Sequence, residues 1–134
     1  MLGVEVVDVT EQVDRTARPA AALDGDAADS AVALRGRVSS APLQRELPSG
    51  AVISTFRVSV PRARSPMTAG SSQGSDWMDC VAWGARTRRT VDGWTVGDLV
   101  EIDGALRRRF YRSGQGSTTR LEVEVLSARR ARDR

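Results

Sequence analysis

The strongest constraint on the fold is a pair of apolar runs in the second half of the chain, separated by a short amphipathic segment. The first run ends at Val81-Ala82-Trp83-Gly84, and the second alternates apolar and polar residues over Asp98–Arg109. Such alternation is typical of β-strands with one buried face. The segment between the runs, Ala85–Asp92, is long enough for only about two helical turns. A strand, a short helix and a second strand that ends in arginines therefore predict part of a small β-barrel.

Three further runs have the composition of β-strands. Val32–Val38 alternates apolar or small residues with arginines, Ala51–Val60 places apolar side chains on one face, and Thr118–Leu126 alternates apolar residues with glutamates. Turn signals separate the runs, chiefly Pro-Ser-Gly at 48–50 and a long polar loop over Pro61–Ser75. Five strands with one short helix between the third and fourth predict the all-β, five-stranded Greek-key barrel known as the OB-fold. Strand counting alone leaves another small β-barrel as the alternative.

The charge of the chain is distributed unevenly. Residues 1–30 contain seven acidic residues against two arginines, whereas residues 31–134 contain 18 arginines against 10 acidic residues. The net charges are thus −5 and +8, within a total of +3. A strongly basic domain is the electrostatic signature of a polyanionic partner. Every basic residue is arginine, which a GC-rich genome would also produce, although arginine alone offers forked phosphate contacts and stacking on bases.

The residue types that the chain lacks argue against catalysis. It has one cysteine, Cys80, and no histidine, so an internal disulfide, common metal-site spacings and histidine-based catalytic pairs are ruled out. We therefore expect no enzyme, no cofactor and no metal site, and we expect Cys80 to be a small buried hydrophobe rather than a redox group. No apolar run approaches the roughly 18 residues of a membrane span, and Met1–Ser30 lacks a signal-peptide layout, which predicts a cytoplasmic protein.

Composition divides the chain into three parts. We expect an acidic, flexible extension over residues 1–30, a folded domain over 31–127 and a short basic tail over 128–134. Within the extension, Val4–Val9 is either an added edge strand or unstructured, and we favour the second interpretation. The binding residues are therefore expected within the folded domain.

Seven short motifs follow one another over residues 31–126, and they are Gly36-Arg37, Pro42-Leu43-Gln44-Arg45, Pro48-Ser49-Gly50, Phe56-Arg57-Val58-Ser59-Val60, Val81-Ala82-Trp83-Gly84, Gly97 through Leu106, and Arg107-Arg108-Arg109-Phe110-Tyr111. No single motif is specific, but their order and spacing resemble the bacterial single-stranded-DNA-binding protein family. The resemblance implies an OB-fold that binds single-stranded DNA without sequence preference, in support of replication, recombination or repair. It also implies a homo-oligomer, with a tetramer favoured and a dimer as the alternative.

The chain departs from that family in two places. Near Pro61–Arg64 the family often has another stacking aromatic residue, and this chain has none. The chain ends in a basic segment rather than in the acidic, aromatic-tipped tail through which family members recruit replication and repair enzymes. We therefore expect a short paralogue that does not bind replication or repair proteins through such a tail.

Aromatic side chains are the first set of candidate binding residues. Trp77 and Trp83 lie six positions apart in one predicted strand, so both rings are expected on the same face. The resemblance implies that these two residues and Tyr111 are platforms on which bases stack. The alternatives are that the tryptophans belong to the core and that Phe110 exchanges roles with Tyr111. Trp94 is expected in the core.

Arginines form the second set of candidates. They are expected to follow the phosphates of a bound strand, with the loop arginines closing over it; the alternative for each is a solvated surface charge. A second function also stays open, in which the chain is an OB-fold accessory protein of replication restart that acts mainly through protein contacts. A third is a barrel that only mediates assembly. The arginine candidates are Arg35, Arg37, Arg57, Arg107, Arg109 and Arg112 in or beside the strands and Arg62 and Arg64 in the loop.

Overall fold

The computed structural model describes residues 28–114 and 116–132, apart from the side chain of Ser113, and nearly all of the expected acidic extension lies outside these ranges. The described elements are β1 (Ala31–Glu46), β2 (Val52–Pro61), β3 (Ser75–Ala82), α2 (Ala85–Asp92), β4 (Leu99–Ser113) and β5 (Gly116–Arg130). In this part of the chain, helical segments fall well short of the length and apolar character that a bilayer crossing demands.

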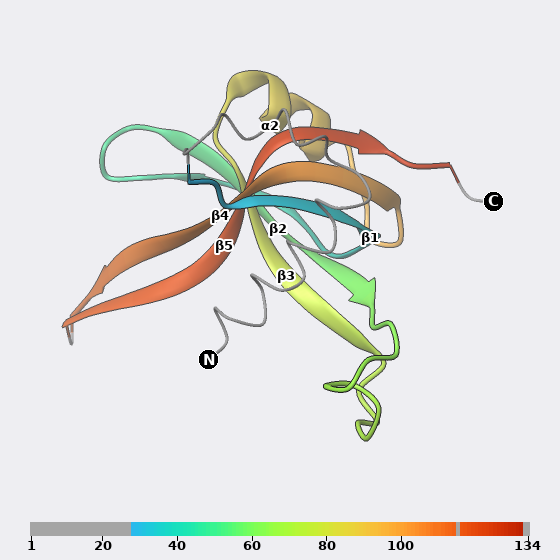
Figure 1. Ribbon diagram of the computed structural model, residues 1–134. Helices are drawn as coiled ribbons and strands as arrows, with labels where there is room; N and C mark the ends of the chain where they lie inside the picture. Colours follow the sequence, from blue (N-terminus) through green and yellow to red (C-terminus); the bar gives the residue numbers. More distant parts are fainter. Residues whose placement is uncertain (1–27, 115, 133–134) are drawn as a thin grey trace.

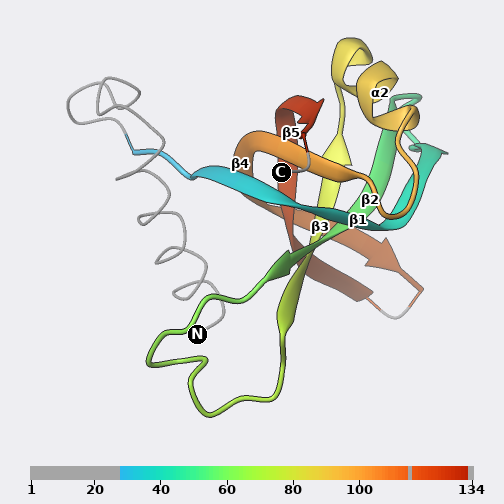
Figure 2. The ribbon, with the colours of Figure 1, turned by 90° about the vertical axis from the view of Figure 1, so that its right-hand side faces the viewer.

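The five strands form a closed barrel in the order β1-β2-β3-β5-β4 (Figure 1). Four of the five strand pairs are antiparallel, and the parallel pairing of β3 with β5 closes the barrel. The short helix α2 connects β3 to β4. This order confirms the predicted five-stranded OB-fold. Seen from the side, α2 lies at one end of the barrel and the loop after β2 at the other (Figure 2).

The first strand is longer than the sequence pattern predicts, because Pro42 does not end it. Two register shifts interrupt its pairing with β2, one between Val38 and Ser40 and the other between Ser40 and Leu43. The second half of β1 pairs with β2 alone, since its pairing with β4 ends at Arg37. A proline is tolerated at a bulge or where a strand has one neighbour, because no ladder hydrogen bond is lost there.

The last strand is also longer than predicted. It continues beyond Leu126 and past the expected domain boundary at residue 127, and Arg130 still pairs with Val100 of β4. The backbone N–H of Ala131 donates to the carbonyl of Leu99 at 2.8 Å. Residues 128–130 therefore belong to the barrel, because β4 offers them a complete row of partners.

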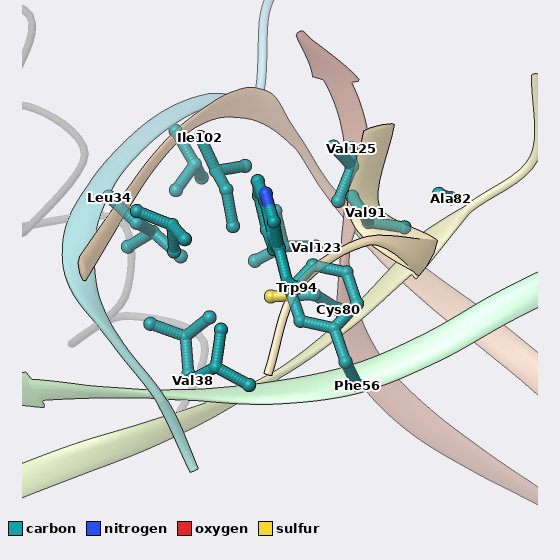
Figure 3. Packing of buried hydrophobic residues seen from close by; sticks show 13 residues of the cluster. Leu34, Val38, Phe56, Cys80, Ala82, Val91, Trp94, Ile102, Val123 and Val125 are labelled. Atoms are coloured by element: carbon teal, nitrogen blue, oxygen red, sulfur yellow. The ribbon is translucent and has the colours of Figure 1, made fainter. Parts of the chain in front are cut away.

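The hydrophobic core lies inside the barrel and beneath α2 (Figure 3). Trp94, only 4% exposed, packs edge-on against Phe56 with the ring centroids 5.5 Å apart. Val91 of α2 is fully buried, so the helix covers this end of the barrel. Cys80 is buried beside these rings, and burial, reinforced by the charges of Asp79 and Glu122, raises the pKa of its thiol. The core positions expected for Trp94 and Cys80 are confirmed.

Candidate nucleic-acid interface

A hollow on the barrel surface brings together residues from the end of β3 and from β4 and β5. Trp83, which follows β3 directly, and Val81 of β3 both line this hollow. The parallel pairing of Val81 with Glu124 places these strands side by side. The remaining lining residues are Arg107, Arg108 and Arg109 of β4 and Glu122 and Glu124 of β5.

The two candidate tryptophans are surface residues. Trp77 is 55% exposed and Trp83 is 39% exposed, in contrast to the buried Trp94. The core alternative for Trp77 and Trp83 is therefore wrong. Their exposure follows from the pleat of β3. The side chain of Cys80 points into the barrel, and those of the odd-numbered residues Trp77 and Trp83 point outward. Val81 is the exception on that face, since it is only 2% exposed where β3 meets β5.

Arg57 of β2 contacts both the ring of Trp77 and a carboxylate. Its guanidinium carbon lies 4.1 Å from the ring centroid, a cation–π contact. Its Nε donates to Asp79 Oδ1 at 3.0 Å, because the antiparallel register places Arg57 directly opposite Asp79. An arginine thus lies over one of the proposed stacking rings while an acid holds it there.

Tyr111 in the β4–β5 hairpin, like Trp77, has an arginine over its ring and an acid that binds this arginine. The guanidinium of Arg109 lies 4.4 Å from its ring centroid, and that of Arg120 lies 5.0 Å away. Glu122, only 4% exposed, accepts hydrogen bonds of 2.6 Å from both Arg109 Nε and the Tyr111 hydroxyl. Arg109 also donates to the Tyr111 hydroxyl oxygen. Phe110 is 73% exposed and adjacent in an extended strand, so it points to the other face of the hairpin.

Glu122 also contributes to raising the pKa of both Arg109 and Tyr111. Burial and the hydrogen bond and charge of Glu122 raise the pKa of Tyr111. Burial alone would lower the pKa of Arg109, but the hydrogen bond and charge of Glu122 raise it above its usual value. Both shifts reinforce the states that these groups already have at neutral pH, a charged arginine and a neutral tyrosine that donates a hydrogen bond.

Two further polar contacts surround Trp83. Arg107 Nε donates to Glu124 Oε1 at 2.9 Å, and the two side chains are 57% and 28% exposed. Arg88 of α2 donates from Nε to the backbone carbonyl of Trp83 at 3.1 Å, which ties the helix to the end of β3. The described residues offer no group of three acidic or cysteine side chains placed to hold a metal ion.

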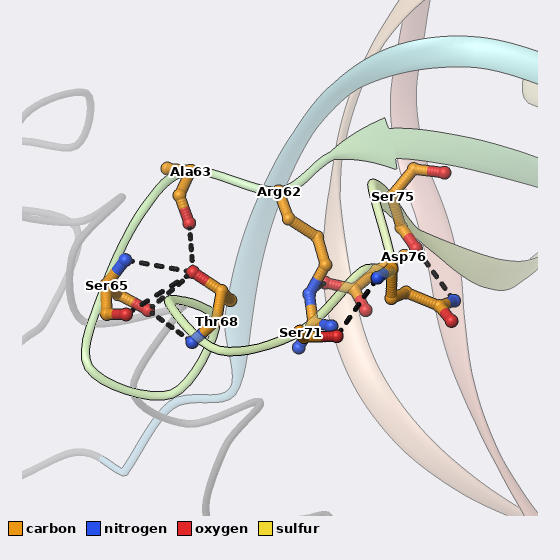
Figure 4. Close-up of polar contacts among 8 residues, drawn as sticks. Arg62, Ala63, Ser65, Thr68, Ser71, Ser75 and Asp76 are labelled. Carbon is orange, nitrogen blue, oxygen red and sulfur yellow. Dashed lines mark hydrogen bonds and ion pairs between the residues drawn. The ribbon is translucent and has the colours of Figure 1, made fainter.

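The two loop arginines differ in their surroundings, and Figure 4 shows the contacts around Arg62. The Arg62 side chain is only 11% exposed, with Nε 3.3 Å from Asp76 Oδ2, and its backbone N–H donates to the carbonyl of Gly74. These contacts close the base of the loop. Thr68 makes a tight turn with Ser65 farther out. Arg64 is exposed and, within the residues that the structure describes, makes no ion pair.

The remaining predicted arginines lie away from the hollow. Arg35 of β1 donates to Glu101 of β4 at 3.0 Å and to the carbonyl of Arg132. Arg37 donates to the carbonyl of Gly97 at 3.0 Å. Arg112 is exposed near the tip of the β4–β5 hairpin. The structure therefore brings Trp83, Arg107 and Arg109 together and pairs Trp77 with Arg57, but it leaves these three arginines outside both groups.

Sequence reasoning missed the acidic partners of the site. Asp79, Glu122 and Glu124 each bind one of the candidate arginines. The alternation in Thr118–Leu126 places Glu122 and Glu124 on one outward face, which is the only signal that the sequence carries. Their partners depend on the pairing of β5 with β4 and β3, and no local pattern contains that register.

The closed barrel, with one short helix between β3 and β4, has the topology of an OB-fold, and Trp77 and Trp83 are exposed on its surface with arginines nearby. The model of the single-strand binding protein family matches residues 29–130, and the chain belongs to that family. This is a family of binding proteins rather than of enzymes, in agreement with the expectation of a non-catalytic chain.

Three individual relatives are named as single-stranded DNA-binding proteins. Single-stranded DNA-binding protein A of Bacillus subtilis is 31% identical over 85 residues, which cover 63% of this chain and 48% of that protein. The single-stranded DNA-binding protein of Bacillus cereus is 30% identical over 96 residues, covering 72% and 55%. That of Mycobacterium tuberculosis is 29% identical over 102 residues, covering 74% and 62%. The chain thus spans about half the length of the first two relatives.

Proposed function

We propose that this chain binds single-stranded DNA without sequence preference and without catalysis. Bases stack on Trp77, Trp83 and Tyr111, and arginines beside these rings bind the phosphates. The observation that supports this most is the exposure of Trp77 and Trp83 on a closed OB barrel, each next to a basic side chain. Unpaired strands need flat rings for the bases and cations for the backbone, and this face offers both.

The arginines are proposed to act in two groups. Arg57, Arg107 and Arg109 contact phosphates next to the stacked bases, because each lies beside one of the three rings or in the hollow with it. The others extend the phosphate path away from the rings, at the first half of β1, in the loop after β2 and at the β4–β5 hairpin. This second group is Arg35, Arg37, Arg62, Arg64 and Arg112.

We further propose a cellular role in replication, recombination or repair, carried out by a homo-oligomer. Membership in the single-strand binding protein family supports both parts of this proposal. A tetramer is favoured over a dimer.

The proposal is tested by tryptophan fluorescence during titration with oligo(dT). Stacked bases quench indole emission, so we expect strong quenching that arises from the exposed Trp77 and Trp83. Trp94, which is 4% exposed, retains its emission. A duplex of the same length should quench far less, because paired bases cannot place their faces on the rings.

The matched control is a chain with Trp77→Phe and Trp83→Phe, in which the remaining indole is Trp94. This variant should bind oligo(dT), as measured by the anisotropy of a labelled strand, with almost no change in its own emission. Unchanged fluorescence and anisotropy of the wild-type chain at low salt would contradict the proposal. That result would favour an OB-fold accessory protein of replication restart that acts through protein contacts.

A further inference from the structure

We propose that Asp79 and Glu124 compete with the phosphates of the nucleic acid for the arginines of the site and thereby lower its affinity. This inference rests on the proposed function, since it concerns the same surface. Each acid holds an arginine next to a stacking ring in the free protein. A bound strand must replace that carboxylate with a phosphate.

Asp79 lies where a strand on Trp77 has to pass. It is opposite Arg57 in the ladder, and the two side chains are joined at 3.0 Å. The same guanidinium lies 4.1 Å from the centroid of the Trp77 ring. A base that stacks on this ring therefore brings its phosphates close to both Arg57 and Asp79, one attractive and the other repulsive.

Glu124 has the corresponding position beside Trp83. It lines the same hollow and binds Arg107 at 2.9 Å. Both side chains of this pair are partly exposed, at 57% for Arg107 and 28% for Glu124. Water and a phosphate can therefore reach the pair, and exposed ion pairs are weak enough to exchange.

Glu122, although it also lines the hollow, does not have this role. It is 4% exposed, and its two oxygens are bound at 2.6 Å by Arg109 and by the Tyr111 hydroxyl. A phosphate has no access to replace it, and its removal would leave Arg109 with an unpaired, partly buried charge. Glu122 is thus a positioning residue for Tyr111, whereas Asp79 and Glu124 are exchangeable competitors.

The competition has a simple physical basis. Carboxylate and phosphate oxygens accept hydrogen bonds from the same guanidinium N–H groups, so one displaces the other. The displaced carboxylate then remains near the phosphate, and the two negative charges repel each other. Converting the acid to its amide removes the repulsion and frees the arginine, with almost no change in side-chain volume.

The test measures the affinity of Asp79→Asn and Glu124→Gln for fluorescein-labelled oligo(dT) by anisotropy. We expect each variant to bind about three- to fivefold more tightly than the wild-type chain at low salt. This factor corresponds to the interaction free energy of an exposed ion pair. The slope of log affinity against log salt between ~50 and ~200 mM NaCl should change little, because the same arginine also contacts a phosphate in the wild-type complex.

Asp92→Asn is the matched control. Asp92 is exposed at the end of α2, outside the hollow, and within the described residues it accepts hydrogen bonds from Gln44 and Ser54 rather than from an arginine. The substitution changes the net charge by the same amount as the two test variants, and we expect little gain in affinity from it. Thermal unfolding of all three variants is used to check that each is folded like the wild-type chain.

Unchanged or weaker binding by both Asp79→Asn and Glu124→Gln would overturn the inference. An equal gain from Asp92→Asn would also overturn it, because net charge rather than local competition would then determine the affinity. Absence of binding by the wild-type chain would instead contradict the proposed function. The two proposals therefore fail in different ways.

Discussion

At the scale of single residues, exposure separates the three tryptophans into two roles. Trp94 packs against Phe56 in the core, while Trp77 and Trp83 present their rings on the surface. An exposed indole costs free energy in a monomer unless something covers it, and Arg57 covers part of Trp77. We interpret the exposed rings as platforms that stay accessible to a ligand.

Substitution of the tryptophans distinguishes these roles. Trp83→Ala should weaken oligo(dT) binding by about 1–3 kcal/mol, because one stacking platform is lost, and leave thermal stability nearly unchanged. Trp94→Ala should instead lower the free energy of unfolding by about 3–5 kcal/mol through loss of a buried ring. Calorimetry and anisotropy on both variants measure the two effects. A large loss of stability in Trp83→Ala would show that its ring supports the barrel.

At the scale of elements, two glycines allow neighbouring strands of the barrel to approach each other closely. At Gly104, which follows a register shift in β4, an added Cβ would lie 2.1 Å from the carbonyl oxygen of Glu124. At Gly36 of β1, an added Cβ would lie 2.4 Å from the carbonyl oxygen of Ser59 in β2. Both contacts are with backbone atoms, which move only if the strands move. The two glycines therefore allow the strong bending of β1 and β4.

Gly104→Ala tests this account of barrel closure. We expect the free energy of unfolding to fall by about 1–3 kcal/mol, the usual cost of overpacking a well-packed interior. Gly70→Ala is the control, because its Cβ would meet no atom within 4 Å, and its effect should stay within about 0.5 kcal/mol. Chemical denaturation measures both variants. Equal stabilities would show that the strands shift at little cost.

At the scale of the whole molecule, the net charge overestimates the number of arginines that are available to bind a DNA strand. Residues 31–134 have an excess of eight positive charges, yet Arg57, Arg107 and Arg109 are each bound to an acid beside a ring. Attraction of a polyanion at long range depends on the net charge. The phosphate contacts in the complex depend on which ion pairs exchange.

The salt dependence of binding measures these contacts. If four or five phosphates are neutralised per subunit, log affinity should fall with log salt at a slope of roughly −3, at about −0.7 per contact on a single strand. Anisotropy titrations of wild-type chain with oligo(dT) at a series of NaCl concentrations give this slope. A slope near zero would contradict the phosphate contacts of the arginines.

The sequence by itself determined the strands, the helix and the burial or exposure of several single residues. Alternation over Asp98–Arg109 and the turn signals predict the barrel, because a period of two and a sharp turn are local properties of the chain. The outward direction of Trp77 follows from the same local pattern, whereas the core position of Trp94 was expected from the family resemblance. The register shifts that accommodate Pro42 could not be predicted from the local pattern, because they depend on the strands that pair with β1.

Only the tertiary structure decided which charges neutralise one another. Arg57 meets Asp79 across two strands, and Arg107 meets Glu124 across the β4–β5 ladder, although neither pair is adjacent in sequence. The burial of Glu122 beneath Tyr111 and the exposure of Glu124 two residues later are likewise products of packing. The register between strands determines these contacts, and the register is a property of the closed barrel rather than of any one segment.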